Sequence, residues 1–453
     1  MGEKTQKLFG TDGVRGVVNQ YPMTPEVALR LGKALAKVFR DAQDIKTVLI
    51  GKDTRLSGYM FETALTAGIT SMGLDVYLVG PLPTPAVAHL TKSFNANAGI
   101  MISASHNPAG DNGIKIFSEK GMKLSDEKEA EIEREFFSDS LEESCVEPHE
   151  VGRVQRLDEA HGRYVEFAKS TVKYQDLAGL KVVLDCANGA AYAVAPKIFG
   201  ELGVDLTVIF DQPNGRNINS GCGATHVEAL AEEVLACGAD IGIALDGDAD
   251  RIIVVDEKGA VVDGDQILCL AALRMKREGR LNNNAVVTTV MSNLGLKLLM
   301  REHDIDVVVT GVGDRYVIEE LVKHDHNLGG EQSGHIIFSE HNLTGDGIIA
   351  GLQVLSMMKN SGEPISSLAS VMTKAPQALI NLRVKEKPAF SSLPEVSAAM
   401  EAAEASLGED GRLLVRYSGT EPIARVLVEG VDEEKVKTLA ESVGNALKDA
   451  IGE

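Results

Sequence analysis

Three acidic side chains at alternate positions form one chemically distinctive segment. Asp246, Asp248 and Asp250 lie in DGDADR, directly after the apolar run IGIAL. Three carboxylates in one tight loop repel one another strongly unless a cation lies among them. Such hard oxygen ligands suit Mg²⁺, which usually keeps further positions for water or a phosphate oxygen. We therefore predict a magnesium site. An acidic turn exposed to solvent is the alternative, and Arg251 at the sixth position argues against a calcium EF-hand loop.

A serine and a histidine stand side by side in the segment ISASHNP. Ser105 beside His106 suggests a hydrolase, but no G-x-S-x-G pattern is present and adjacent residues point in different directions. Phosphoryl transfer fits better, because a phosphorylated serine carries about two negative charges and its oxygens could complete the ligand set of the metal. Ser105 is therefore predicted to carry a phosphoryl group and to bind the metal; an ordinary turn is the alternative.

The segment GEQSGH offers groups that suit a sugar. Glu331, Ser333 and His335 alternate, so all three would project to one side of an extended segment. Carboxylate and hydroxyl groups in this arrangement can hydrogen-bond to sugar hydroxyls. A turn or capping role is the alternative.

The segment RYSGTEP offers groups that suit a phosphate. A cation, two hydroxyls and backbone N–H groups come together in Arg416, Ser418, Gly419 and Thr420. We predict a phosphate cradle here. Arg425 is a second candidate for it, with an ordinary surface arginine as the alternative.

The elements that would position these loops recur three times. Short Val/Ile/Leu runs predict buried strands, each followed by helix-compatible sequence and a second, parallel strand. A polar loop and a hairpin-like stretch come next in each copy. The first strands are KTVLIG (46–51), LKVVLD (180–185) and NAVVTTV (284–290). We therefore predict an α/β protein: three similar βαβα-type domains with mixed sheets, followed by a smaller C-terminal α+β domain.

Each predicted domain contributes one loop. The domains are 1–150 with the phosphoserine loop, 155–255 with the metal-binding loop, 256–370 with the sugar-recognition loop, and 375–453 with the phosphate-binding loop. The charged segment 126–150 and the stretch 370–378 are predicted to be connectors. Near the N-terminus, Thr24 and Pro25 fit the N-cap and first turn of a helix with an apolar stripe that includes Leu31.

Length, charge and cysteine content limit the domain number, the partners and the location that we expect. The chain of 453 residues suits about three domains, or four compact ones, and its net charge of −21 argues against nucleic-acid and anionic membrane partners. The opening segment lacks the apolar region of an export signal, and no stretch approaches the roughly 18 apolar residues of a membrane span. Five cysteines without a C-x-x-C pair indicate neither disulfides nor a thiolate metal site, so we expect a cytoplasmic protein.

Taken together, the motifs resemble those of the α-D-phosphohexomutase superfamily. The resemblance rests on FGTDGVRG (9–16), ISASHNP, DGDADR, GEQSGH with the trailing TGDG (344–347), and RYSGTEP, in that order along the chain. It implies four domains around a central cleft. The segments are most similar to those of members that interconvert glucosamine 6-phosphate and glucosamine 1-phosphate, on the route to UDP-N-acetylglucosamine and the cell wall. The family reaction passes through a phosphoserine enzyme and a 1,6-bisphosphate intermediate.

The resemblance implies a role for each candidate residue. Ser105 corresponds to the phosphoserine, and Asp246, Asp248 and Asp250 to the Mg²⁺ ligands. Ala249 departs from the glycine that the family often has, a mild change that keeps the aspartates in register. The remaining positions are Arg15 supporting the serine loop, Lys115 in the catalytic loop region, Arg251 at phosphate near the metal, His335 as an acid/base candidate, Glu331 and Ser333 at sugar hydroxyls, and Arg416, Ser418, Gly419 and Thr420 at the distal phosphate.

The resemblance also implies small-molecule partners. They are Mg²⁺, a phosphosugar substrate, and glucosamine 1,6-bisphosphate or glucose 1,6-bisphosphate as activator and intermediate. A phosphate donor or kinase would first phosphorylate Ser105, and a homodimer is consistent with the resemblance.

Two rival functions remain open. A phosphomannomutase or phosphoglucomutase would use the same mechanism, and the resemblance places Asp314 and Arg315 of VGDRYV near the sugar that distinguishes them. A magnesium-dependent sugar phosphatase is a rival of another class, but a phosphatase needs only one phosphate grip. A silent binding protein would be expected to lack Ser105 or an aspartate, and all are present.

The covalent scheme makes a direct prediction. Ser105→Ala should abolish mutase turnover and leave folding intact, because the hydroxyl that carries the phosphoryl group is removed while a small side chain remains. Turnover in a coupled assay and the circular dichroism spectrum measure the two effects. Unimpaired turnover in the variant would contradict a phosphoserine intermediate.

Overall fold

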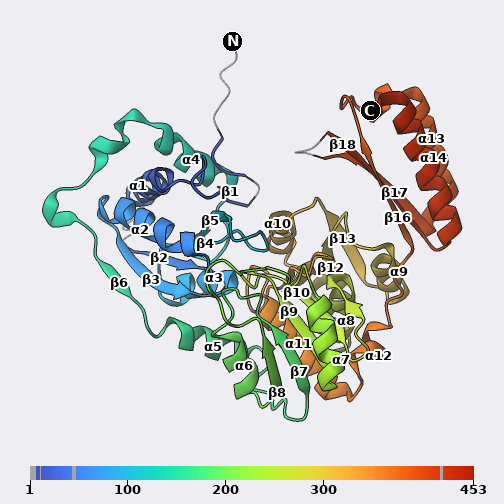
Figure 1. Ribbon diagram of the computed structural model, residues 1–453, viewed down its shortest axis with the longest axis horizontal. Helices are drawn as coiled ribbons and strands as arrows, with labels where there is room; N and C mark the ends of the chain where they lie inside the picture. The colour runs from blue at the N-terminus through green and yellow to red at the C-terminus, as the bar shows by residue number, and fades with distance from the viewer. Residues whose placement is uncertain (1–6, 11, 43–46, 419–421) are drawn as a thin grey trace. The chain divides into compact units, whose positions relative to one another are not determined.

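The chain forms two compact units. The computed structural model describes residues 7–10, 12–42, 47–418 and 422–453. One unit consists of Met1–Val290 with Val308–Ala369, and the other of Met291–Val307 with Ser370–Glu453. Figure 1 shows the elements of each unit along the chain.

The first domain of the larger unit is built on a six-stranded mixed sheet. The strand order is β1-β5-β4-β2-β3-β6. Strand β2 pairs in parallel with β3 and β4, whereas β5 runs antiparallel to β4 and β1. The strands are β1 (Val14–Val17), β2 (Thr47–Lys52), β3 (Asp75–Pro81), β4 (Ala98–Ile102), β5 (Asp111–Ser118) and β6 (Val154–Arg156). The helices are α1 (Pro25–Ala42), α2 (Leu56–Thr70), α3 (Thr84–Ser93) and α4 (Asp126–Phe137).

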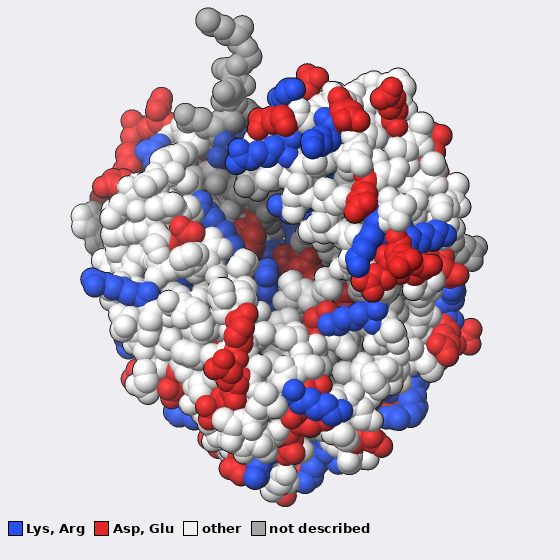
Figure 2. Space-filling view, turned by 45° about the vertical axis from the view of Figure 1, so that its right-hand side comes forward, with Lys and Arg blue, Asp and Glu red and all other residues white. Residues whose placement is uncertain are grey.

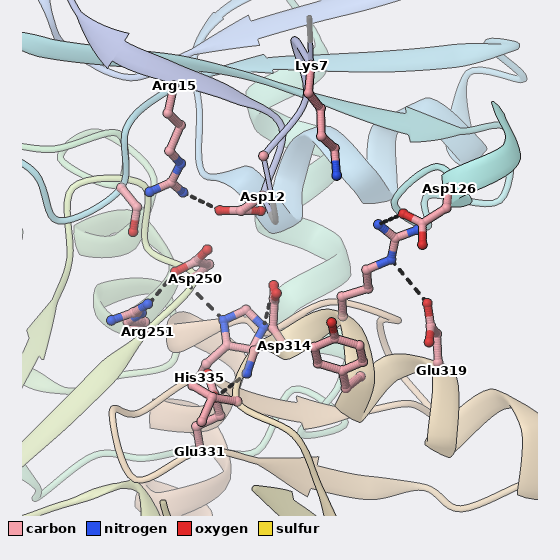
Figure 3. A pocket seen from close by; sticks show the side chains of 16 residues that line it. Lys7, Asp12, Arg15, Asp126, Asp250, Arg251, Asp314, Glu319, Glu331 and His335 are labelled. Atoms are coloured by element: carbon pink, nitrogen blue, oxygen red, sulfur yellow. Dashed lines mark hydrogen bonds and ion pairs between the residues drawn. The ribbon is translucent and has the colours of Figure 1, made fainter. Parts of the chain in front are cut away.

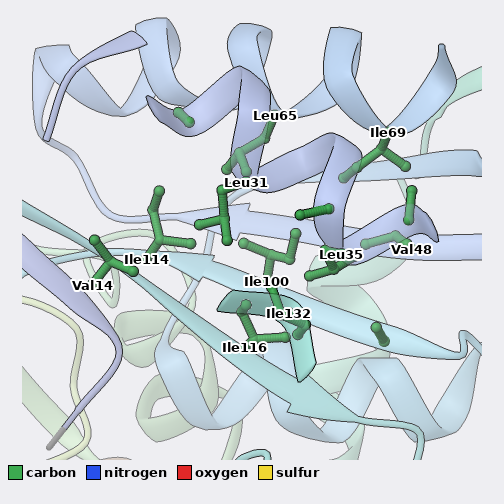
Figure 4. Close-up of a cluster of buried hydrophobic side chains, with 14 of the residues drawn as sticks. Val14, Leu31, Leu35, Val48, Leu65, Ile69, Ile100, Ile114, Ile116 and Ile132 are labelled. Atoms are coloured by element: carbon green, nitrogen blue, oxygen red, sulfur yellow. The ribbon is translucent and has the colours of Figure 1, made fainter. Parts of the chain in front are cut away.

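Helix α1 confirms the expectation for the N-terminal segment. It begins at Pro25, and the hydroxyl of Thr24 accepts a hydrogen bond from the N–H of Val27 at 3.4 Å. Its apolar stripe packs against the sheet, where Leu31 meets branched side chains such as Ile100 (Figure 4). Removal of this apolar surface from water stabilises the domain that holds the first loop.

The prediction that 126–150 is a connector is wrong, because its first part is helix α4. The hydroxyl of Ser125 caps the helix, and Ile132 and Phe136 are buried in the core of the first domain. The carboxylate of Glu133 accepts hydrogen bonds from the N–H groups of Leu8 and Phe9 at 2.6 and 2.7 Å. Dense charge on the exposed face hid the two apolar positions, which lie one helical turn apart.

The second domain has a five-stranded sheet with the order β11-β10-β9-β7-β8. Strands β7, β8 and β9 are parallel, and β10 forms antiparallel pairs with β9 and β11. The strands are β7 (Lys181–Asp185), β8 (Asp205–Ile209), β9 (Ile241–Leu245), β10 (Ile252–Asp256) and β11 (Val261–Val262). The helices are α5 (Ala160–Ser170), α6 (Ala195–Glu201) and α7 (Glu228–Cys237).

The third domain repeats the plan with four strands in the order β13-β12-β14-β15. The start of helix α11 contacts the second domain. The Tyr164 hydroxyl of α5 donates a hydrogen bond to Asp346, the N-cap of α11, at 2.9 Å. The strands are β12 (Ala285–Thr289), β13 (Asp306–Thr310), β14 (Leu328–Gly330) and β15 (Ile336–Phe338). The helices in the larger unit are α8 (Gly264–Arg277), α10 (Asp314–His324), α11 (Gly347–Ser361) and α12 (Ile365–Ala369), whereas α9 (Leu294–Glu302) belongs to the smaller unit.

The smaller unit contains an antiparallel sheet with the order β16-β18-β17. Helices α13 and α14 cover one face of it (Figure 1). The strands are β16 (Gln377–Arg383), β17 (Gly411–Tyr417) and β18 (Ile423–Gly430), and the helices are α13 (Pro394–Leu407) and α14 (Glu433–Ile451). The predicted fold class is thereby confirmed: three α/β domains with mixed sheets and a smaller α+β domain.

Charge is distributed in small groups of both signs. Acidic and basic side chains are interspersed on the face that Figure 2 shows. Among the described helices, none has the length and apolar character needed to cross a bilayer.

The contact between α1 and α2 predicts opposite effects for two glycine-to-alanine changes. A Cβ at Gly68 in α2 would lie 2.2 Å from the carbonyl oxygen of Leu29 in α1, so Gly68→Ala should lower the free energy of unfolding by about 2 kcal/mol. A Cβ at Gly162 in α5 meets nothing within 4 Å, so Gly162→Ala should raise it by about 0.5–1 kcal/mol. Urea denaturation followed by circular dichroism measures both. Equal effects would contradict the close helix contact.

Candidate active site

Three predicted loops of the larger unit meet at one cavity. Ser105 follows β4, the aspartate loop joins β9 to β10, and the GEQSGH turn joins β14 to β15. The cavity has a volume of about 430 Å³ (Figure 3). Six of the predicted site residues line it: Arg15, Ser105, Asp250, Arg251, Glu331 and His335.

Ser105 is buried and points at the aspartate loop. Its Oγ donates a hydrogen bond to Oδ2 of Asp246 at 2.6 Å, and Nδ1 of His106 lies 3.4 Å from the same Oγ. The backbone of Ser105 has a left-handed conformation with a φ of 51°. A residue with a side chain is strained in that region, which is often found at functional sites. The geometry thus joins the serine hydroxyl to the predicted metal ligands.

The aspartate loop has the donor set that a hard cation requires. Carboxylate oxygens of Asp246, Asp248 and Asp250 lie within 4.8 Å of one another, and all three side chains are buried. Burial and the charges of its two neighbours raise the pKa of Asp246 well above its ordinary value. Within the described residues, Oδ1 of Asp248 and Oδ1 of Asp250 are buried and have no hydrogen-bond partner. Orphaned buried oxygens beside a like-charge cluster fit a divalent cation.

Ala249 lies in the middle of the aspartate loop in a left-handed conformation. It is fully buried and has a φ of 55°, a region that favours glycine. Its N–H donates to the carbonyl oxygen of Asp246 at 3.0 Å, and its own carbonyl accepts from the N–H of Gly347 at 3.0 Å. The aspartates stay in register because these two hydrogen bonds hold the turn.

Lys115 places a fixed positive charge against the aspartate loop. Its Nζ lies 3.0 Å from Oδ2 of Asp248, 3.2 Å from Oδ2 of Asp250 and 3.6 Å from Oδ2 of Asp12. Although burial opposes its charge, these carboxylates raise the pKa of Lys115 well above its ordinary value. Burial likewise opposes the charge of Asp250, but Lys115 and His335 hold its pKa well below the usual range. The pair Lys115 and Asp250 therefore remains ionised.

Two residues of the site, Asp12 and Lys123, were missed by sequence reasoning. Asp12 pairs with Arg15 and with Lys123, and Nζ of Lys123 also contacts Oδ2 of Asp314 at 2.6 Å. Asp12 lies in FGTDGVRG, from which only Arg15 was selected, whereas Lys123 belongs to no motif. Asp314 and Arg315 also line the cavity.

His335 is held in one orientation by the TGDG segment. The N–H of Gly345 donates to Nε2 at 3.0 Å, so the neutral ring carries its proton on Nδ1, which lies 3.8 Å from Oδ1 of Asp250. Nε2 also lies 3.6 Å from Oδ2 of Asp314. Against the effect of burial, the two carboxylates raise the pKa of His335. A second proton, on Nε2, would nevertheless break the hydrogen bond from Gly345.

The GEQSGH segment is a turn, which is the alternative to an extended segment that the sequence left open. The N–H of Gly334 donates to the carbonyl oxygen of Glu331 at 3.0 Å, and Gly334 has a φ of 92°. A Cβ at Gly334 would lie 1.9 Å from the carbonyl oxygen of Ile252, so glycine is needed to bend the chain here. Glu331 and His335 line the cavity, whereas Ser333 is exposed and does not.

The predicted phosphate cradle lies in the smaller unit. Arg416 of β17 stands directly opposite Arg425 of β18. The N–H of Ser418 donates to the carbonyl oxygen of Ile423 at 2.8 Å. The two arginines place two positive charges on neighbouring strands at this point of the sheet. Gly419 and Thr420 lie outside the described residues.

Comparison with known proteins places this site in a family. Sequence models of the phosphoglucomutase/phosphomannomutase family match along most of the chain. They cover α/β/α domain I at 6–143, domain II at 162–259, domain III at 263–375 and the C-terminal domain at 379–446. The chain belongs to the phosphoglucomutase/phosphomannomutase family.

The chain is also similar to individual proteins of known name or structure. The phosphoglucosamine mutase of Syntrophotalea carbinolica is 52% identical over 449 residues, which cover 99% of this chain and 98% of the relative. A phosphoglucomutase/phosphomannomutase family protein from Burkholderia thailandensis has a crystal structure with a TM-score of 0.82 at 24% identity, covering 98% of this chain and 97% of that one. The Aspergillus fumigatus N-acetylphosphoglucosamine mutase, solved in complex with GlcNAc-6P and magnesium, gives a TM-score of 0.64 at 20% identity, covering 85% and 94%.

The aspartate loop predicts that Mg²⁺ reverses the order of thermal stability between the original protein and a variant that lacks one of the three aspartates. In metal-free protein, Asp246→Asn should leave the melting temperature unchanged or raise it, because burial and the neighbouring carboxylates already disfavour a charge on Asp246 and the amide carries none. Saturating Mg²⁺ should then stabilise the original protein by about 2.7 kcal/mol at one hundred times Kd, and stabilise the variant much less. Thermal melts with EDTA and with Mg²⁺ measure the effect.

Asp205→Asn is the matched control, because Asp205 is an exposed aspartate of β8 in the same domain. It should keep the full Mg²⁺ response. A melting temperature of the original protein that does not respond to Mg²⁺ or Mn²⁺ would contradict a cation site.

Proposed function

We propose that this protein is a phosphoglucosamine mutase that interconverts glucosamine 6-phosphate and glucosamine 1-phosphate. The observation that carries the proposal is the 2.6 Å hydrogen bond from the Ser105 hydroxyl to Asp246, at a buried carboxylate cluster on the cavity wall. The names of the full-length relatives support the amino-sugar substrate. The proposed reaction supplies an intermediate for UDP-N-acetylglucosamine and cell-wall synthesis.

Ser105 is proposed to carry the phosphoryl group. In the first transfer the bond between phosphorus and Oγ of Ser105 breaks, and a bond forms between phosphorus and the free hydroxyl oxygen of the bound monophosphate. The hydroxyl proton passes to the site and Oγ regains one, so a 1,6-bisphosphate and free serine result. The second transfer returns the other phosphate to Ser105. Both steps depend on alignment and electrostatic stabilisation.

The residues around Ser105 would stabilise the charge that moves. Asp246, Asp248 and Asp250 would hold Mg²⁺, which when bound neutralises charge on the phosphoryl group. Lys115 supplies a permanent positive charge beside them. His335 presents its Nδ1 proton toward Asp250 and is the proposed acid/base group.

The cations on the cavity wall would bind phosphate, and the carboxylates would bind the sugar. Arg251 lies beside the aspartate loop, with Nε 3.8 Å from Oδ1 of Asp250. Arg15 faces the same cavity, where it is held by Asp12. Glu331 is the proposed ligand of sugar hydroxyls. Its Oε1 accepts from the N–H of Gly313 at 3.2 Å, which fixes the carboxylate at the wall. Ser333 is proposed as its partner in the same turn.

A second phosphate grip is proposed in the C-terminal domain, 375–453. Arg416 and Arg425 would bind the phosphate that is not being transferred, together with Ser418, Gly419 and Thr420. The three preceding domains, 1–150, 155–255 and 256–370, are proposed to carry the phosphoserine, metal and sugar loops. Turnover then requires the bisphosphate to reverse its orientation between the two transfers, so that each phosphate reaches Ser105 in turn.

Further properties follow from the proposal. Glucosamine 1,6-bisphosphate or glucose 1,6-bisphosphate would act as activator, and a phosphate donor or kinase would prime Ser105. A cytoplasmic location and a homodimer are proposed on the same basis. A phosphomannomutase or phosphoglucomutase would differ only in the preferred sugar, and a phosphatase would release inorganic phosphate.

A comparison of substrates tests the proposal. With Mg²⁺ and a trace of sugar 1,6-bisphosphate, kcat/KM should be highest for glucosamine 6-phosphate among three substrates, the others being mannose 1-phosphate and glucose 1-phosphate. Coupled assays measure the three values, and a phosphate-release assay runs beside them. Preference for mannose or glucose phosphate would overturn the substrate but keep the mechanism, whereas stoichiometric phosphate release would favour the phosphatase.

A further inference from the structure

The backbone of Ser105 is closed into a ring of hydrogen bonds within the first domain. Its N–H donates to Oγ of Ser103 at 2.9 Å, and that hydroxyl donates to Oδ2 of Asp53 at 2.6 Å. Asp53 pairs with the guanidinium of Arg55, and Nη2 of Arg55 donates back to the carbonyl oxygen of Ser105 at 3.3 Å. Ser103, Asp53 and Arg55 are all fully buried. Both polar groups of the Ser105 backbone are therefore fixed by one circuit.

Asn219 fixes the same loop from the second domain. Its Nδ2 donates to the carbonyl oxygens of Ser105 and Asn107 at 2.9 and 3.0 Å. Nη2 of Arg55 also reaches the carbonyl oxygen of Asn107, at 2.5 Å. A carbonyl oxygen has two lone pairs, and here each oxygen receives one hydrogen bond from Arg55 and one from Asn219. The two side chains thus clamp two carbonyls of the serine loop together.

The clamp is packed directly against the aspartate loop. A Cβ at Gly247 would lie 2.6 Å from the carbonyl oxygen of Ser105 and 2.7 Å from Nδ2 of Asn219. Asn219 itself has a φ of 56°, a conformation that asparagine tolerates better than most residues. Its N–H donates to the carbonyl oxygen of Ala187 at 3.0 Å, which anchors it to the second domain. A shift of Asn219 would therefore displace the serine relative to Asp246.

We infer that Asn219, with Arg55, is a positioning residue for phosphoryl transfer at Ser105. The inference rests on the proposed function. The left-handed backbone of Ser105 is strained, and the clamp keeps it in place while the side chain alternates between hydroxyl and phosphate. The same Oγ position then serves both transfers. Asn219 touches neither Ser105 Oγ nor the cavity, so it acts only through the loop that it holds.

The isosteric variant Asn219→Asp tests the clamp. An aspartate keeps the shape but places an oxygen against two carbonyl oxygens, so attraction becomes repulsion. We expect kcat to fall about 10- to 100-fold with KM for glucosamine 6-phosphate within about twofold, because a small misplacement of a reacting group costs alignment and not binding. The ratio of inorganic phosphate to sugar product should also rise, since a loosened phosphoserine is more open to water.

Asn327→Asp is the matched control. Asn327 is another buried asparagine whose Nδ2 donates to a backbone carbonyl, that of Arg280, at 2.7 Å, and it does not line the cavity. Its variant should lower the melting temperature to a similar extent and leave kcat and the product ratio unchanged. A merely structural role for Asn219 would give the two variants the same kinetics.

The possible results distinguish a failure of the positioning role of Asn219 from a failure of the proposed function. A kcat of Asn219→Asp within twofold of the original protein overturns the positioning role and leaves the proposed function standing. Absence of mutase activity in the original protein overturns the proposed function instead. If Asn219→Asp does not fold, Arg55→Lys replaces it. Lysine keeps a positive charge but has one nitrogen, so it cannot bind Asp53 through one nitrogen and the two carbonyl oxygens through another as Arg55 does, and an unchanged kcat in that variant overturns the inference equally.

Discussion

Three carboxylates cannot be buried side by side unless positive charge is built around them, and this constraint organises the larger unit. Lys115 comes from the first domain and Arg251 from the loop itself, and both charges lie within 4 Å of Asp250. His335 of the third domain lies within 4 Å of the same carboxylate through Nδ1, which carries the proton of the neutral ring. Groups from all three domains thus meet at the aspartate loop. Removal of that loop's charge would leave several buried cations without a counter-charge, which is a costly state.

The serine and aspartate loops could be predicted because each follows a strand with a clear apolar pattern, whereas GEQSGH follows the short, glycine-rich strand β14. Ser105 and the three aspartates occur at ends of strands β4 and β9, and the carboxyl ends of such strands are where side chains converge in α/β folds. The helix that follows Thr24 could likewise be predicted from its N-cap residue and from its stripe of apolar side chains. Ser333 stays a prediction, since alternation implies one face only in an extended chain and Gly334 turns the chain here.

Residues whose role depends on contacts made only in the folded protein could not be recognised from the sequence pattern. Asn219 lies far from Ser105 in the sequence, in a loop with no strand or motif, and its role depends on two carbonyl groups that every residue possesses. Lys123 is similar: its importance comes from the carboxylates of Asp12 and Asp314 that the fold brings to it. A sequence pattern reveals clusters of reactive side chains, such as the three aspartates. It does not reveal an ordinary asparagine or lysine that the fold brings into contact with other residues of the site.

The methyl group of Ala249 has a consequence for how the loop recruits a cation. A glycine in the middle of DGDADR would let the unliganded turn sample many shapes, each of which must be given up when ligands close on an ion. Alanine disfavours the left-handed backbone that the turn requires, but here that backbone is buried and hydrogen-bonded at both polar groups, which holds it in place. The cost of this conformation is met when the chain folds, so the loop is preorganised and part of its affinity is set before any ion arrives.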